Sequence, residues 1–229
     1  MIEEFKKYNR KILLNLKNLQ TDIAKISKIN NRNLNQIKLM LVTKTLSKEK
    51  IIITLNSGYK LFGENRVQES KKKWPELKKK YNNIELHLIG ALQRNKVKEA
   101  VALFDVIETL DRFSLVESLS QEEKRLNKKL EYFIQINTGN ERQKAGVFAN
   151  ESKEFIEECL KKYDLNVSGL MCIPPQSEKP EEHFEYLNSL GKQFHIKKLS
   201  MGMSNDYKMA IKCGSTQIRI GSKIFGSRN

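Results

Sequence analysis

The stretch Ile37-Lys38-Leu39-Met40-Leu41-Val42-Thr43-Lys44 is a short apolar run that ends on a lysine. The stretch Ser47-Lys48-Glu49-Lys50-Ile51-Ile52-Ile53 follows it with the spacing of a helix. This order is typical of a buried parallel strand and the helix that crosses back over its sheet. Lysine alone means little in a chain with 42 Lys and Arg. At the inner end of a buried strand, however, burial favours the neutral amine, which is a nucleophile that forms Schiff bases with carbonyl compounds.

Similar strand-then-helix units recur along the chain. We expect strands at Lys38–Thr43, Lys60–Gly63, Glu85–Ile89, Val106–Glu108, Glu131–Asn137, Asn166–Met171, Lys197–Met201 and Gln217–Ile220. Helical patterns lie between them, at Asn65–Tyr81, Asn95–Leu103, Phe113–Leu126, Ser152–Tyr163 and Pro180–Phe194. Connections of this length suit parallel strands. Eight such units predict a single (β/α)8 TIM barrel; a doubly wound open sheet is the alternative, but the even spacing favours closure.

The residues before the first strand predict an additional N-terminal helix at Glu4–Lys28, followed by the Asn-rich link Asn30–Asn35. No composition break elsewhere suggests a second domain. We therefore expect residues 1–229 to form one domain, with residues 1–35 packed on the barrel.

The composition is that of an ordinary globular protein, with 39% hydrophobic and 30% charged residues. No apolar run approaches the roughly 20 residues of a membrane span, and the first residues lack the apolar segment of a signal peptide. Three cysteines are scattered without the spacing of a metal site, and their odd number fits a reducing compartment. We expect a cytoplasmic protein without a membrane or metal partner.

The net charge of +15 raises nucleic acid as a partner. The cations are spread along helical stretches such as Lys71-Lys72-Lys73, Lys78-Lys79-Lys80 and Lys161-Lys162, and no basic stretch alternates with aromatic residues. We interpret the charge as solvated surface and expect no nucleic-acid partner.

Two C-terminal loops have the composition of a phosphate site. Gly202-Met203-Ser204-Asn205-Asp206 follows the seventh strand, and Ile220-Gly221-Ser222-Lys223 follows the eighth. TIM barrels often bind phosphate with these two loops, because glycine allows close backbone approach and serine adds a hydroxyl. For one loop alone, the simpler interpretation is that Ser204 and Asp206 cap a helix. Two such loops at a barrel mouth that also holds Lys44 favour phosphate.

A set of short motifs resembles one known family in order and spacing. The motifs are Val42-Thr43-Lys44-Thr45, Phe62-Gly63-Glu64-Asn65, His87-Leu88-Ile89-Gly90, Gln93-Arg94-Asn95-Lys96, Gln135-Ile136-Asn137, Lys144-Ala145-Gly146, Gly169-Leu170-Met171, Ser200-Met201-Gly202-Met203-Ser204 and Arg219-Ile220-Gly221-Ser222-Lys223-Ile224-Phe225-Gly226. The family is that of the pyridoxal phosphate homeostasis proteins. Its fold resembles the barrel domain of alanine racemase without the second β domain. The resemblance runs from about Leu39 to the C-terminus.

The resemblance implies a site for pyridoxal 5'-phosphate (PLP). Lys44 matches the lysine that forms the internal aldimine, and Arg219 matches the arginine that faces the pyridine nitrogen. A permanent cation there discourages protonation of that nitrogen and weakens the cofactor as an electron sink. The other positions that match the family's cofactor-binding residues are Ser204, Gly221, Ser222, Asn65, Asn137 and Met201.

Other interpretations remain open for several of these residues. Asn65 is also suited to capping a helix, and His87 to a hydrogen-bonded place in the core. Arg219 has a buried carboxylate, Glu64 or Glu108, as an alternative partner. Glu64 itself is suited either to orienting Lys44 or to holding the barrel rim. The segment Gln93–Lys96 is either a solvated helical turn or a contact near the cofactor.

The resemblance implies a protein that holds PLP as a lysine aldimine and acts in intracellular PLP homeostasis, without turnover. Its expected partners are PLP and apo PLP-dependent enzymes, and the expected oligomeric state is a monomer. The alternative is a PLP-dependent amino-acid racemase or decarboxylase. Racemisation needs a second acid or base on the opposite face of the cofactor, and the related racemases take that group from their β domain.

Overall fold

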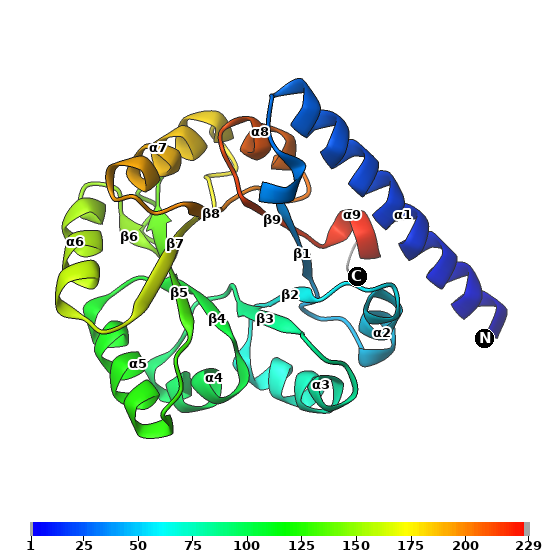
Figure 1. Ribbon diagram of the computed structural model, residues 1–229, viewed down its shortest axis with the longest axis horizontal. Helices are drawn as coiled ribbons and strands as arrows, with labels where there is room; N and C mark the ends of the chain where they lie inside the picture. Colours follow the sequence, from blue (N-terminus) through cyan, green and yellow to red (C-terminus); the bar gives the residue numbers. More distant parts are fainter. Residues whose placement is uncertain (1, 227–229) are drawn as a thin grey trace.

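Eight parallel strands close into a barrel in the computed structural model, which describes residues 2–226, with the side chains of the first helix described from Lys7 onward (Figure 1). The order around the barrel is β4-β3-β2-β1-β9-β8-β7-β5, and pairing of β4 with β5 closes it. The strands are β1 (Lys38–Val42), β2 (Leu61–Glu64), β3 (Glu85–Leu88), β4 (Val106–Leu110), β5 (Glu131–Asn137), β7 (Asn166–Cys172), β8 (Lys198–Ser200) and β9 (Gln217–Ile220). The expected TIM barrel is confirmed, and all eight expected strands occur within about two residues of their predicted bounds.

The helices form a ring outside the strands (Figure 1). They are α1 (Ile2–Ile29), α2 (Lys48–Asn56), α3 (Val67–Lys80), α4 (Val97–Leu103), α5 (Phe113–Leu126), α6 (Ser152–Lys162), α7 (Pro180–Gln193), α8 (Tyr207–Lys212) and α9 (Ser222–Phe225). A short parallel strand that the sequence did not reveal, β6 (Val147–Phe148), adds to β5. Two residues are too few to produce a visible alternation of apolar and polar side chains.

Side chains along each strand point alternately toward the surrounding helices and into the barrel. Leu86 and Leu88 of β3 belong to the large apolar core between strands and helices, whereas His87 points the other way, into the barrel. A smaller apolar cluster inside the barrel consists of Val106, Phe133 and Met171. The sequence pattern therefore fixes which side of each strand meets the helices.

Much of the remaining barrel interior is polar. Glu108 is fully buried, and His87, Ser200, Gln217 and Arg219 are each less than 5% exposed. His87 Nδ1 lies 2.5 Å from Glu108 Oε1. Ser200 Oγ donates to Glu108 Oε2 at 2.6 Å, and Gln217 Nε2 donates to Glu108 Oε1 at 2.6 Å. A hydrogen-bonded network thus replaces much of the branched apolar packing usual inside such barrels.

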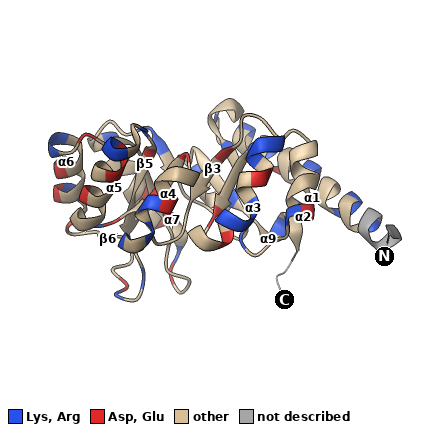
Figure 2. Cartoon of the chain, turned by 90° about the horizontal axis from the view of Figure 1, so that it is seen from below, with Lys and Arg blue, Asp and Glu red and all other residues tan. Residues whose placement is uncertain are grey.

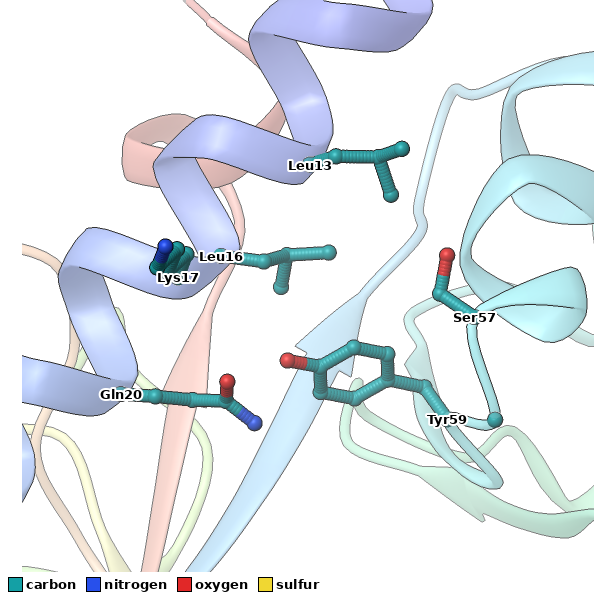
Figure 3. Close-up of a pocket in the computed structure, with 7 residues that line it drawn as sticks. Leu13, Leu16, Lys17, Gln20, Ser57 and Tyr59 are labelled. Carbon is teal, nitrogen blue, oxygen red and sulfur yellow. The ribbon is translucent and has the colours of Figure 1, made fainter.

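Helix α1 packs along one side of the barrel and contacts its C-terminal elements. Tyr8 and Asn15 donate side-chain hydrogen bonds to the backbone oxygens of Phe225 and Ile224. A hollow of about 310 Å³ lies between α1 and the turn after α2, where Tyr59 points toward the helix (Figure 3). The expected N-terminal helix is therefore present and anchored to the barrel.

Basic and acidic side chains are interspersed over the outer helices. Figure 2 shows Lys and Arg interspersed with Asp and Glu along the helices of this view, with no continuous basic face. Many of these cations are in ion pairs, such as Lys48 with Glu76 and Lys161 with Glu157. Within residues 2–226, no helix combines the length and the hydropathy needed to cross a bilayer.

The buried His87 network predicts a pH dependence of stability. Burial by itself lowers the pKa of His87, but the carboxylates of Glu108 and Glu85 outweigh it and raise the pKa above 6.5. The hydrogen bond from His87 lowers the pKa of Glu85 from 4.5 to about 2. The contribution of His87 to the free energy of unfolding is complete below pH 6.5 and is lost as the pH rises through the raised pKa. The contribution of Glu85 is lost as the pH falls below 4.5 toward 2.

We therefore expect His87→Gln to lower the free energy of unfolding more at about pH 5.5 than at about pH 9. Urea unfolding of both proteins at the two pH values measures this difference. The exposed His195 supplies a control, because His195→Gln leaves the buried network intact. An equal loss at both pH values for His87→Gln would contradict a charged His87 in the folded protein.

Candidate functional site

A cavity of about 830 Å³ opens at the C-terminal ends of the barrel strands. Its walls come from the ends of β1, β2 and β3 and from the loops after β7, β8 and β9. The lining residues are Val42, Lys44, Asn65, Ile89, Ile173, Pro174, Pro175, Gln176, Glu178, Pro180, Met203, Ser204, Asn205, Asp206, Arg219, Gly221 and Ser222. This is the face of a TIM barrel on which ligand sites are found.

Most of the residues expected from the sequence meet in this cavity. Those that line it are Lys44, Asn65, Ser204, Arg219, Gly221 and Ser222. Two expected residues are not among the described lining residues. Met201 is fully buried in the core between strands and helices. Asn137 is buried, and its side-chain amide donates to the backbone oxygens of Glu141 and Lys144, so it shapes the loop after β5.

Lys44 enters the cavity because of its position in the strand alternation. Val42 and Lys44 line the cavity, whereas Thr43 between them points outward and is fully buried. The next residue, Thr45, has φ 64°, a left-handed conformation that is costly for a β-branched side chain. Such strain persists only where the surroundings hold it in place.

A buried ion pair holds the strand end beside Lys44. The carboxylate of Glu64 is fully buried and accepts hydrogen bonds from Thr43 Oγ1 at 2.7 Å and Trp74 Nε1 at 3.0 Å. Lys73 Nζ lies 2.7 Å from Glu64 Oε1. Burial raises the pKa of Glu64, although Lys73 opposes this shift. Glu64 therefore holds the barrel rim.

Lys73 and Glu69 together bond to the chain on both sides of Lys44. Its ammonium donates to the backbone oxygen of Thr43 at 3.0 Å and to Glu69 Oε1 at 2.7 Å. The same Glu69 oxygen accepts from the backbone N–H of Thr45 at 2.6 Å. Thr43 and Thr45 are both tied to this cluster, which fixes the backbone that carries Lys44.

The two serine loops meet as the sequence suggested. Ser222 Oγ donates to Ser204 Oγ at 3.0 Å, so hydroxyls from the loops after β8 and β9 lie side by side. Asp206 Oδ1 accepts from the N–H of Met203 at 2.5 Å and stabilises the turn that presents Ser204. Gly202 begins this turn with φ 94°, which favours glycine. Helices α8 and α9 have only six and four residues, so the donors are hydroxyls and loop amides rather than a long helix dipole.

Arg219 forms part of the cavity wall with a fixed side chain. It is 3% exposed. Its Nη1 donates to the Ser200 backbone oxygen at 2.6 Å and to Ser200 Oγ at 2.8 Å, and its Nη2 donates to the Cys172 backbone oxygen at 2.8 Å. Of the two carboxylates considered from the sequence, Glu108 reaches Arg219 through Ser200, and Glu64 pairs with Lys73 instead.

The sequence interpretation missed one side of the cavity. The loop after β7 contributes Ile173, Pro174, Pro175, Gln176 and Glu178. A Pro-Pro pair directly after a barrel strand is a loop signal at the functional face and would have pointed to it. The segment Gln93–Lys96 lies outside the lining and forms the exposed turn Arg94–Lys96, which agrees with the solvated-turn interpretation.

The chain matches one group of known proteins in sequence and in fold. Residues 14–229 match the family model described as alanine racemase, N-terminal domain. The chain is 36% identical over 225 residues to the pyridoxal phosphate homeostasis protein of Haemophilus influenzae, covering 94% of this chain and 95% of the relative. It is 38% identical over 206 residues to that of Aquifex aeolicus, covering 86% and 90%. The chain belongs to the pyridoxal phosphate homeostasis protein family.

A solved structure of a similar protein agrees with this family. PipY of Synechococcus elongatus, solved with PLP bound, is 28% identical and superposes with a TM-score of 0.76, covering 89% of this chain and 100% of the other. The family resemblance expected from the motifs is therefore confirmed.

The Lys73 cluster gives a prediction about stability. Lys73→Ala leaves the carboxylate of Glu64 buried without its cation, so we expect the free energy of unfolding to fall by about 3–5 kcal/mol. Lys72→Ala is the matched control, because the neighbouring Lys72 side chain is exposed, and should change stability by less than about 0.5 kcal/mol. Urea unfolding measures both values. Similar small losses in the two variants would show that the ion pair does not stabilise the rim.

Proposed function

We propose that this protein binds PLP in the cavity at the barrel mouth and takes part in PLP homeostasis. The observation that carries the proposal is the meeting of one amine, one fixed guanidinium and two serine loops in a single cavity of about 830 Å³. An amine can condense with an aldehyde, a guanidinium can face a pyridine nitrogen, and serine loops can bind a phosphate. Family membership supports the same ligand, since the PipY structure was solved with PLP bound.

The residues present fit PLP one group at a time. When bound, PLP supplies an aldehyde that condenses with amines and a ring that withdraws electrons. We assign the Lys44 amine to the aldehyde carbon, with which it would condense. Ser204, Ser222 and the Gly221 backbone are assigned to the phosphate. Asn65, on the wall, is assigned a polar contact with the ligand.

Arg219 is assigned to the pyridine nitrogen. Its guanidinium is held by the oxygens of Ser200 and Cys172, so it meets the ligand as a permanent cation. A cation at this position opposes protonation of the ring nitrogen and limits the withdrawal of electrons into the ring. This supports a role in holding the cofactor rather than in carbanion chemistry.

The proposed role is non-enzymatic: the protein holds PLP in the cytoplasm, as a single-domain monomer, and supplies it to apo PLP-dependent enzymes. The relatives carry the name of homeostasis proteins rather than of enzymes. Besides Lys44 and Arg219, the ionisable side chains among the described lining residues are Glu178 and Asp206. Glu178 Oε2 lies 3.0 Å from His183 Nε2, and Asp206 accepts from the Met203 N–H, so both carboxylates are engaged in local structure.

The first test concerns the covalent attachment of PLP. We expect purified protein incubated with PLP to become yellow, and borohydride reduction followed by peptide mass spectrometry to locate the adduct on Lys44. Lys44→Ala should lose the adduct, because no other lysine is among the described lining residues. Lys48→Ala is the control, since Lys48 pairs with Glu76 outside the cavity.

Two outcomes would contradict this proposal. An adduct distributed over several lysines in the wild type would remove the assignment to Lys44. Racemisation or decarboxylation of an amino acid, present in the wild type and lost in Lys44→Ala, would contradict the non-enzymatic role.

The second test concerns the phosphate. We expect the double variant Ser204→Ala/Ser222→Ala to weaken PLP binding by roughly a hundredfold or more, because each lost hydrogen bond to a charged group contributes about 1.5 kcal/mol or more. Binding of pyridoxal, which lacks the phosphate, should be unchanged by the same substitutions. Equilibrium titration followed by absorbance measures both ligands. Equal weakening for PLP and pyridoxal would place the phosphate elsewhere.

A further inference from the structure

Four ionisable side chains alternate in sign through the inside of the barrel. They are Glu85 and His87 of β3, Glu108 of β4 and Arg219 of β9. His87 Nε2 lies 2.9 Å from Glu85 Oε1, and His87 Nδ1 lies 2.5 Å from Glu108 Oε1. The link from Glu108 to Arg219 passes through Ser200. One end of this chain of contacts is the cavity wall, and the other is the N-terminal face of the barrel.

The hydrogen-bond geometry fixes where the protons are. Both ring nitrogens of His87 face carboxylate oxygens. An ionised carboxylate only accepts hydrogen bonds, so beside two ionised carboxylates both nitrogens carry hydrogen and the ring is a cation. Ser200 has one hydroxyl proton, and its neighbours Arg219 and Gln217 both donate to it. That proton therefore goes to Glu108. Glu108 accepts from Ser200 and Gln217 and faces His87 Nδ1, an arrangement that an ionised carboxylate satisfies.

The direction of the pKa shift of Glu108 agrees with this assignment. Burial raises the pKa of Glu108, but the hydrogen bond and charge of His87, together with Arg219 and Ser200, outweigh burial and lower it. An arginine stays charged at all accessible pH values, so a guanidinium that is 3% exposed needs a nearby anion. Asp206 also feels the Arg219 charge, but its carboxylate turns to the Met203 N–H. Inside the barrel, Glu108 is therefore the anion that balances Arg219.

We propose that Glu108 is a positioning residue for Arg219. Glu108 orients the guanidinium through Ser200 and balances its charge, and the His87 cation lies on the opposite side of Glu108. The proposal rests on PLP as the ligand of the cavity, because the guanidinium is then aimed at the pyridine nitrogen. Ser200 transmits orientation, since its only proton is committed to Glu108 and its lone pairs face Arg219 and Gln217.

The surroundings of His87 complete the charge balance at the N-terminal face. A hollow of about 370 Å³ there is lined by Glu85, His87, Gln217 and charged residues of the neighbouring strands, namely Lys38, Glu131, Lys197 and Lys198. Glu85 is paired with Lys38 at 3.5 Å and Glu131 with Lys198 at 2.5 Å. The ring of Phe133 packs edge-on against His87. Since Glu85 remains beside it, His87 keeps one carboxylate partner even when Glu108 is replaced.

The first measurement needs no ligand. We expect the crystal structure of ligand-free Glu108→Gln to show the Arg219 guanidinium moved away from Ser200 Oγ, since the charge that aligns Ser200 is gone. Ser200→Ala, which removes one hydroxyl and no charge, should also release Arg219 Nη1 from that position. This variant is the test if Glu108→Gln does not fold. Ser215→Ala is the control, because the fully buried Ser215 hydroxyl binds only backbone oxygens outside the chain of contacts. An Arg219 side chain that keeps its place in both test variants overturns the proposal.

The second measurement uses the protein loaded with PLP. We expect the pH midpoint of the visible absorbance band of bound PLP to move by roughly one pH unit in opposite directions in two variants. Glu108→Gln removes an anion and moves the midpoint down, whereas His87→Gln removes a cation and moves it up. Loss of packing alone shifts both in the same direction or neither, and either of those results overturns the proposed charge balance.

The two proposals fail in different ways. If the wild type does not bind PLP, the proposed function fails, and the ligand-free structures still decide whether Glu108 positions Arg219. If the wild type binds PLP on Lys44 but the variants leave Arg219 and the absorbance midpoint unchanged, the proposed function holds and the positioning role of Glu108 is wrong.

Discussion

The closure of a parallel sheet is the constraint on which the other features depend. Because every strand of the barrel runs in the same direction, all their C-terminal ends meet at one rim, and residues far apart in the chain become neighbours. Lys44 follows the end of β1, and Ser204 and Ser222 follow β8 and β9. The pairing of β1 with β9 joins the first strand of the barrel to the last. An open sheet without this pairing would separate the amine from the phosphate loops.

The barrel carries charge both inside and outside its strands, and the two arrangements have different tasks. Outside, Glu64 of β2 pairs with Lys73 of α3, and this pair fixes the rim beside Lys44. Inside, Glu108 and His87 balance Arg219. Removing charged groups from water has a large cost, so buried charges are kept in hydrogen-bonded pairs. The inner network leads through Ser200 to Arg219, and the outer pair holds the backbone of Thr43 next to Lys44.

Much of the fold was predictable because local patterns specify it. Eight short apolar runs separated by amphipathic helices gave the strands, the helices and the closed barrel. The two-residue strand β6 was not predictable, since Val147 and Phe148 are too short a segment to show periodicity. Of the eight residues expected in the cofactor site, six line the cavity, whereas Asn137 bonds to the loop after β5 and Met201 lies in the core between strands and helices. Position at a strand end places a residue near the rim without deciding which way its side chain points.

The sequence by itself determined the order of strands and helices, the parallel barrel, the family and the polar residues at the strand ends. These follow from short-range periodicity and from motifs that are contiguous in the chain. Only the tertiary structure decided that Glu64 pairs with Lys73, that Glu108 reaches Arg219 through Ser200, and that the loop after β7 forms a wall of the cavity. The physical reason is that these contacts join different strands, helices and loops, and barrel closure sets which of their side chains meet.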